Sequence, residues 1–232
     1  MFVKDEDLFN NYAFILNKNP QIHNVNTKRA NINIIDNFYE DGDLVLKQIE
    51  KLPMAKIWKR GYKDNGKWFF DARKSYVTNM QGTEIPYSID GSLTKLVSDI
   101  IEYPQESIEP DRQLIVNCFQ FTDELDLSND YYSIHEDSYN APGQVALVVF
   151  LNKYYEEGEG LNFYSALQPN DPRFYTTNSL IKKDEIELIY TVQAKHNRAV
   201  LFDSMFTHGQ YTPTDQFKSE MRYTQAIFLP LL

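Results

Sequence analysis

The sequence predicts an α+β protein, mainly β, whose C-terminal half is an antiparallel sandwich or barrel. Two segments before Pro110 have the spacing of amphipathic helices, whereas the chain after Pro110 contains at least five segments rich in β-branched and aromatic residues. No helical period separates these later segments, so we expect them to pair with one another rather than through crossover helices. The 232 residues contain no internal repeat and no Gly/Ser-rich linker, which favours a single domain over 1–232.

The N-terminal part of the chain is expected to support this β-rich half. Residues 1–30 show no clear period and are predicted to form an irregular arm. Apolar residues then alternate along 32–38, which predicts a strand, and recur at helical spacing along 43–52, where Pro53 is the expected stop.

A second helix is expected over residues 93–101. Its apolar positions follow the i, i+3, i+4, i+7 rule, with Asp90 or Ser92 as the candidate cap and Pro104 beyond its end. With the first helix it defines a predicted helical support region, 32–110, in front of the β-rich core predicted for 111–232.

Between the two helices, residues 58–74 are unusually basic and aromatic. The simpler interpretation is a solvated hairpin whose turn is Asp64-Asn65-Gly66, since Asn-Gly is a strong hairpin signal. The functional interpretation is a rim that contacts a substrate. The sequence leaves both open.

Five strands are predicted after Pro110 from their β-branched and aromatic content. They cover residues 114–121, 144–151, 186–192, 198–203 and 222–229. Turn-forming segments separate them, and the acidic run Glu156–Glu159 is expected to be one of these solvated turns.

Composition excludes several classes of function. The net charge of −10 disfavours sequence-independent binding to nucleic acid and docking on anionic lipid, because both partners are polyanions. The single cysteine, Cys118, excludes an internal disulfide and a cysteine-based zinc or iron–sulfur site, and we expect it in the core.

No signal peptide is visible, and the longest apolar run, 145–151, is far below the ~20 residues that span a bilayer. We therefore expect a cytoplasmic protein without membrane or nucleic-acid partners, of undetermined oligomeric state.

The four histidines limit metal chemistry to a few residues. His23 and His196 lie in polar segments and are predicted to be solvated at the surface. His135 is followed two positions later by Asp137, and residues i and i+2 of an extended chain point to the same face. His208, just after an apolar strand-like segment, is the candidate third ligand.

Two imidazoles and one carboxylate form a facial triad that leaves three positions of an octahedral Fe(II) ion open. Those positions can hold a bidentate 2-oxo acid and then O₂. Arg222 opens the last predicted strand and shares a face with Ala226 and Phe228, where an arginine is costly to bury without an anionic partner. Its planar fork matches the distal carboxylate of such a co-substrate, and Thr224, on the same face, could add a hydroxyl donor.

The order of several motifs extends this interpretation. They are Tyr132-x-x-His135-x-Asp137, Ala146–Asn152, Glu157–Phe163, Ala199–Phe202 leading to His208, and Arg222-x-Thr224. Together they resemble the Fe(II)/2-oxoglutarate dioxygenases of the prolyl-4-hydroxylase-like branch, and Ile34–Tyr39, followed by an amphipathic helix, is similar to the way that branch begins.

The resemblance implies a double-stranded β-helix (jelly-roll) core with flanking N-terminal helices. It implies that His135, Asp137 and His208 ligate iron, that Arg222 pairs with the C5 carboxylate of 2-oxoglutarate, and that Tyr132 lines the same pocket. Fe(II), 2-oxoglutarate and O₂ would then be the cofactors and co-substrates, and no catalytic residue beyond the metal ligands is expected.

The implied reaction is hydroxylation of an unactivated C–H bond with release of succinate and CO₂. A peptidyl proline, another amino-acid residue or a small molecule fits as substrate. The alternative is a non-catalytic, cupin-like β-helix that serves as a binding or structural module.

The sequence departs from the family pattern near its centre. Glu159-Gly160 stands where the family usually has Gly-Gly. The nucleic-acid demethylase branch carries a second arginine six residues after the first, and Phe228 occupies that position here, which argues against that branch.

Overall fold

The structure is a computed structural model that describes residues 14–27, 31–50, 55–58, 63–64, 67–68, 70–77, 91–109, 114–121, 131–137, 143–166, 180–182 and 185–232. Among these residues the helices are α1 (Gly42–Glu50), α2 (Gly91–Ile101), the short α3 (Gln216–Ser219) and the 3-10 helix η2 (Gln105–Ser107). The strands of the N-terminal half are β1 (Gln21–Asn26), β2 (Asn31–Asp36), β3 (Ala55–Trp58), β4 (Lys63–Asp64), β5 (Lys67–Trp68) and β6 (Phe70–Val77). Those of the C-terminal half are β7 (Leu114–Phe121), β8 (Tyr131–Ser133), β9 (Gln144–Phe150), β10 (Gly160–Ala166), β11 (Leu180–Lys182), β12 (Ile186–Gln193), β13 (Arg198–Asp203), β14 (His208–Tyr211) and β15 (Arg222–Pro230).

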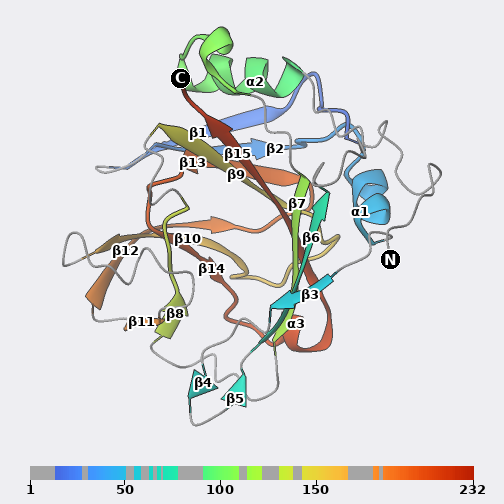
Figure 1. Ribbon diagram of the computed structural model, residues 1–232, viewed down its shortest axis with the longest axis vertical. Coiled ribbons are helices and arrows are strands. Elements are labelled where there is room, and N and C mark those ends of the chain that lie inside the picture. Colours follow the sequence, from blue (N-terminus) through green and yellow to red (C-terminus); the bar gives the residue numbers. More distant parts are fainter. Residues whose placement is uncertain are drawn as a thin grey trace.

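The strands form a large and a small antiparallel sheet. The large sheet has the order β1-β2-β13-β9-β15-β7-β6-β3, and the small sheet has the order β12-β10-β14. In Figure 1 the strands β10, β12 and β14 group together on one side of the long strands, away from α1 and α2. This arrangement confirms the predicted mainly β jelly-roll with helices flanking one face.

The central strands of the large sheet are buried on both faces, which explains their nearly continuous apolar sequences. Along β13, Ala199 and Leu201 pack toward the helices, whereas Val200 and Phe202 pack toward the small sheet. The same alternation runs along β9. One core therefore lies between the large sheet and the helices, and a second core lies between the two sheets, where the candidate site residues of β15 also point.

The five strands predicted after Pro110 are confirmed as β7, β9, β12, β13 and β15, with ends that differ by at most one residue. Strands β8, β10, β11 and β14 were not predicted as separate elements. Strands β8, β11 and β14 have only three or four residues, too few for a clear period-two pattern. In β10, Leu161 and Phe163 alternate with Asn162, but the pattern is lost at Tyr164, where the pairing with β12 shifts register.

The predicted irregular arm is wrong at β1, which pairs with β2 along its whole length. Five of its six side chains are exposed, so neither face of this edge strand is apolar and no alternation appears in the sequence.

The region 32–110 is less helical than predicted, because β3 and β6 extend the large sheet. Ser92 lies inside α2 rather than at its cap, and Asp90 lies outside the described residues.

The predicted hairpin between the helices has a backbone counterpart. Lys63 pairs with Trp68 and Asp64 with Lys67 in the two-stranded sheet β4-β5. The side chains of 58–74, and with them the predicted substrate rim, lie outside the described part of the structure.

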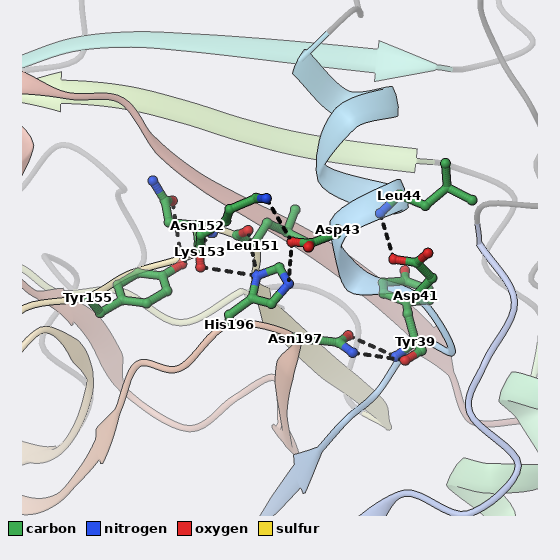
Figure 2. Close-up of polar contacts among 10 residues, drawn as sticks. All are labelled: Tyr39, Asp41, Asp43, Leu44, Leu151, Asn152, Lys153, Tyr155, His196 and Asn197. Carbon is green, nitrogen blue, oxygen red and sulfur yellow. Dashed lines mark hydrogen bonds and ion pairs between the residues drawn. The ribbon is translucent and has the colours of Figure 1, made fainter.

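The turn between β12 and β13 fixes the start of α1 (Figure 2). The Asn197 side chain accepts a hydrogen bond from Tyr39 N at 2.8 Å and donates one to Tyr39 O at 2.8 Å. A Cβ atom on Gly42 would lie 2.7 Å from Asn197 Cβ, so only glycine permits this close approach. Asn197 itself has a φ of 59°, a left-handed conformation that asparagine tolerates better than most residues.

His196, in the same turn, is not freely solvated as predicted. Its Nδ1 donates toward the carbonyl oxygens of Leu151 and Asn152 at 3.0 and 3.2 Å, and its Nε2 lies 3.4 Å from Asp43 Oδ1. The turn folds back onto the end of β9, so the imidazole links that strand to the first turn of α1 (Figure 2). His23 is exposed on β1 and Cys118 is buried, as predicted.

Among the described residues, no helix is long and apolar enough to cross a membrane.

Replacing Asn197 with alanine should lower the free energy of unfolding by about 2–4 kcal/mol. The change removes the side-chain hydrogen bonds to two backbone groups of the buried Tyr39 and places alanine at a positive φ. Replacing Asn197 with glycine removes the hydrogen bonds but relieves the backbone, so it should cost less than alanine. Urea unfolding measures both, with Asn24→Ala on the exposed strand β1 as control. An Asn197→Gly protein as stable as the wild type would show that the side-chain bridge contributes nothing.

Candidate metal centre

The segment after β8 is joined by its backbone to the start of β14. His135 N donates to His208 O at 2.9 Å, and His208 N donates to His135 O at 3.0 Å. Two residues further on, Asp137 N donates to Ser204 O at 2.8 Å. These bonds hold His208 next to His135 and Asp137, although it lies far from both in the sequence.

The orientation of His208 is fixed by its own strand and by aromatic packing. Its ring lies 4.7 Å from that of Phe202, between centroids, and the residue is 3% exposed. Nδ1 lies 2.8 Å from Phe206 O. Because a carbonyl oxygen only accepts, Nδ1 must carry the proton, and this leaves the Nε2 lone pair for a metal ion.

The three side chains converge on one point. His208 Nε2 lies 3.3 Å from Asp137 Oδ2, and His135 Nε2 lies 3.5 Å from Asp137 Oδ1. One ligand atom from each residue lies within 4.8 Å of the others, and no other such group occurs among the described residues. Ligand bonds of about 2.1 Å meeting at a right angle place neighbouring donor atoms about 3 Å apart, so the spacing fits a first-row metal ion. Two imidazoles and one carboxylate are also the donor set of non-haem Fe(II) sites.

The electrostatics of this cluster favour an ionised carboxylate. Burial alone would raise the pKa of Asp137, but the charge of His208 and the hydrogen bonds of both imidazoles outweigh it, so the pKa of Asp137 lies well below its usual range. The pKa of His208 is raised because Asp137 outweighs the effect of burial on the imidazolium. A metal cation would replace the imidazole protons as the partner of this carboxylate.

Arg222 and Thr224 are both buried on β15, as the strand alternation predicted, at 2% and 5% exposure. One guanidinium NH₂ group donates to Gly160 O at 3.2 Å and the other to Gln210 Oε1 at 3.2 Å. Gln210 follows His208 by two positions on β14, so the two side chains stand on one strand face about 6–7 Å apart. Arg222 therefore reaches the neighbourhood of the metal cluster.

Aromatic rings enclose the guanidinium of Arg222. Its Cζ atom lies 5.7 Å from the ring centroid of Phe150 and 5.9 Å from that of Phe217. Tyr155 packs edge-on against both rings, and its burial raises the pKa of its hydroxyl to about 12. Phe217, Tyr155 and Gln210 were not singled out from the sequence, because nothing in their local pattern marks them.

Glu159 contradicts the prediction of a solvated acidic turn. It is 0% exposed, whereas Glu157 in the same run is exposed. Its Oε1 accepts a hydrogen bond from the Thr214 hydroxyl at 2.6 Å. Burial raises the pKa of the Glu159 carboxyl to about 7. Glu159 differs from Glu157 because it immediately precedes β10 and turns into the protein with that strand. The sequence contains one sign of this burial: Glu159 stands where the family usually has glycine.

The remaining candidate, Tyr132, lies in β8, where its backbone pairs with Ile181 of β11. Its side chain is outside the described part of the structure, and the predicted contact with the pocket stays a prediction.

No family model and no curated protein matches the sequence. Solved structures do match the fold. The chain is similar to the non-haem alpha ketoglutarate dependent epimerase SnoN from nogalamycin biosynthesis, with 12% identity, a TM-score of 0.54, and coverage of 87% of this chain and 78% of that one. It is similar to the carbocyclase SnoK from the same biosynthesis, with 7% identity, a TM-score of 0.51, and coverage of 86% and 79%. A prolyl-4-hydroxylase of Pseudomonas putida matches with 11% identity, a TM-score of 0.47, and coverage of 83% and 88%. The likeness to SnoN and SnoK shows that this chain shares their fold.

The cluster should bind one divalent metal ion per chain. Alanine at His135, Asp137 or His208 removes one of three donors and should weaken binding of Mn²⁺ by at least about a hundredfold. This exceeds the roughly 10- to 100-fold loss that is typical when a residue hydrogen-bonded to a ligand is changed. Titration calorimetry measures this, with His23→Ala on the exposed strand β1 as the matched control. Unaltered Mn²⁺ affinity in Asp137→Ala would disprove the site.

Proposed function

We propose that this protein is an Fe(II)- and 2-oxoglutarate-dependent dioxygenase that hydroxylates an unactivated C–H bond. The observation that carries the proposal is the convergence of His135, Asp137 and His208 in a jelly-roll. The buried Arg222, which contacts the same strand as His208, supports it.

Each residue has a distinct role in this proposal. The two imidazoles and the carboxylate hold the ion on one side and leave three positions open. Arg222 offers a fixed fork to the distal carboxylate of 2-oxoglutarate, and Thr224, next on the same strand face, offers a hydroxyl. When bound, Fe(II), 2-oxoglutarate and O₂ supply the oxidising power, and succinate and CO₂ are the by-products.

The protein's own contribution is orientation and exclusion of water. Phe202 packs against the ring of His208, and Phe150 and Phe217 pack around Arg222. A dry pocket strengthens the ion pair between the guanidinium and a bound carboxylate. It also protects reactive species from side reactions with water.

The substrate is proposed only as a class. The resemblance to the prolyl-4-hydroxylase-like branch favours a peptidyl proline or another amino-acid residue, whereas the likeness to SnoN and SnoK, from nogalamycin biosynthesis, favours a small molecule. The net charge of −10 disfavours nucleic acid as a partner. We also propose a cytoplasmic location.

The metal ligands should be required for turnover of 2-oxoglutarate. With Fe(II) and O₂, the wild type should form succinate, and Asp137→Ala should reduce the rate to background because the ion is no longer held. Succinate quantified by mass spectrometry measures this, with His23→Ala as control. Metal binding without any succinate from the wild type, over a panel of peptide and small-molecule substrates, would favour the non-catalytic, cupin-like module instead.

Arg222→Lys should raise KM for 2-oxoglutarate by about 10- to 100-fold with a smaller change in kcat. Lysine keeps the charge but loses the planar fork, and a charge-assisted hydrogen bond contributes about 1.5–3 kcal/mol. Steady-state kinetics give the two constants, and Mn²⁺ affinity should be unchanged because the metal ligands are untouched. An unchanged KM would remove Arg222 from the co-substrate pocket.

A further inference from the structure

The pocket proposed for 2-oxoglutarate already contains a carboxyl group of the protein. Glu159 and Arg222 are both buried, at 0% and 2% exposure. The residue after Glu159, Gly160, accepts the hydrogen bond from the Arg222 guanidinium through its carbonyl oxygen. The two buried and oppositely charged side chains thus stand at the same end of β10.

The backbone around Glu159 is fixed on both sides. Glu159 O accepts a hydrogen bond from Ala194 N at 2.7 Å, and Glu159 N donates to Glu156 O at 3.2 Å. A Cβ atom on Gly160 would lie 2.1 Å from Val192 O, so this position tolerates only glycine. The backbone that carries this carboxyl group is therefore held in place by the pairing of β10 with β12.

The two oxygens of the Glu159 carboxyl differ in their partners. Oε1 accepts from the hydroxyl of Thr214 at 2.6 Å and from its amide at 3.3 Å. Oε2 is buried and has no hydrogen-bond partner among the described residues. An ionised carboxylate with one unpartnered oxygen is costly to bury, whereas the protonated form needs only one further acceptor.

Few charged or titratable groups face this carboxyl from the described elements packed against it. Arg222 on β15 favours the ionised form, and Glu156, in the same loop as Glu159, disfavours it. Tyr155 also interacts with it, but burial keeps that hydroxyl neutral at ordinary pH. Burial is the largest influence, and the resulting pKa of Glu159, about 7, lies in the range where small changes of local charge alter its protonation.

A bound 2-oxoglutarate would change that local charge. With Glu159 ionised, the charges of Arg222 and Glu159 cancel, and a distal carboxylate would add an uncompensated buried negative charge. With Glu159 protonated, the distal carboxylate and Arg222 form a balanced pair. Binding of the dicarboxylic co-substrate therefore favours protonation of Glu159.

We infer that 2-oxoglutarate enters the pocket together with one proton, which is taken from solvent and held by the carboxylate of Glu159. The inference rests on the proposed function and makes Glu159 a positioning residue that sets the charge of the co-substrate pocket. A 2-oxo acid without a distal carboxylate, such as 2-oxobutanoate, would bind without this proton.

Proton uptake can be measured by calorimetry on the Mn²⁺-loaded protein, with 2-oxoglutarate titrated in buffers of different ionisation enthalpy. Because the metal is already bound, its ligands do not titrate during the experiment. At pH 7.5, with a pKa of about 7 for free Glu159, the wild type should take up about 0.8 proton per 2-oxoglutarate. The apparent Kd should be about tenfold weaker at pH 8 than at pH 6, in proportion to the protonated fraction.

Glu159→Gln is the decisive variant, since the amide is neutral and of similar shape. It should bind 2-oxoglutarate with no uptake of this proton and with almost no change of Kd between pH 6 and 8. Glu157→Gln, in the exposed part of the same turn, is the matched control and should behave as the wild type. In the wild type, 2-oxobutanoate should show no uptake.

The outcomes separate the inference from the proposed function. A wild type that binds no 2-oxoglutarate contradicts the proposed function, and with it the premise of the inference. Equal proton uptake by the wild type and Glu159→Gln overturns the inference and leaves the proposed function intact. If Glu159→Gln does not fold, Thr214→Val provides the test. It removes a hydrogen-bond donor that favours the ionised carboxylate of Glu159, so the pH at which proton uptake is half-maximal should rise. An unchanged half-maximal pH would overturn the inference.

Discussion

The candidate site depends on one short-range constraint, the reciprocal backbone hydrogen bonds between His135 and His208. They join the segment after β8 to strand β14 of the small sheet. The hydrogen bond from Asp137 N to Ser204 O extends this connection to the end of β13. Because β13 is buried on both faces, it is among the most firmly fixed elements of the fold. The three proposed ligands are thus brought together by backbone pairing, and the Phe202 ring and Phe206 O then orient the imidazole of His208.

A second constraint is the balance of charge behind that cluster. Arg222 is buried among aromatic rings and donates a hydrogen bond to the carbonyl oxygen of Gly160, the residue that follows the buried Glu159. In the proposed function the buried guanidinium of Arg222 binds an anionic ligand, and the carboxyl of Glu159, whose pKa is close to neutrality, balances the charge of Arg222 when that ligand is absent. In this view the affinity for a dicarboxylic 2-oxo acid and the pH of the surroundings are linked through a residue that touches no metal ligand.

How well each element could be predicted from the sequence depends on how deeply its side chains are buried. Strands β7 and β13 were predicted with the bounds that the structure shows, because their sequences are rich in β-branched and aromatic residues. In β13 these residues are buried. Strand β1 was missed because it lies at the edge of the sheet with exposed side chains. The prediction that His196 is solvated was wrong because its sequence neighbours are polar. In the structure the turn folds back, and part of the imidazole ring is covered at the end of β9.

From the sequence alone it was possible to identify the donor types, the period-two placement of Asp137 after His135, and Arg222 on an apolar strand face. These are local properties, set by residue chemistry and strand geometry. Only the tertiary structure could decide that Glu159, one of a run of acidic residues, is the member that is buried beside Arg222, since the direction of its side chain depends on how β10 pairs with β12 and β14. Long-range pairing decides which of several equivalent side chains faces the interior, and residue spacing cannot encode that choice.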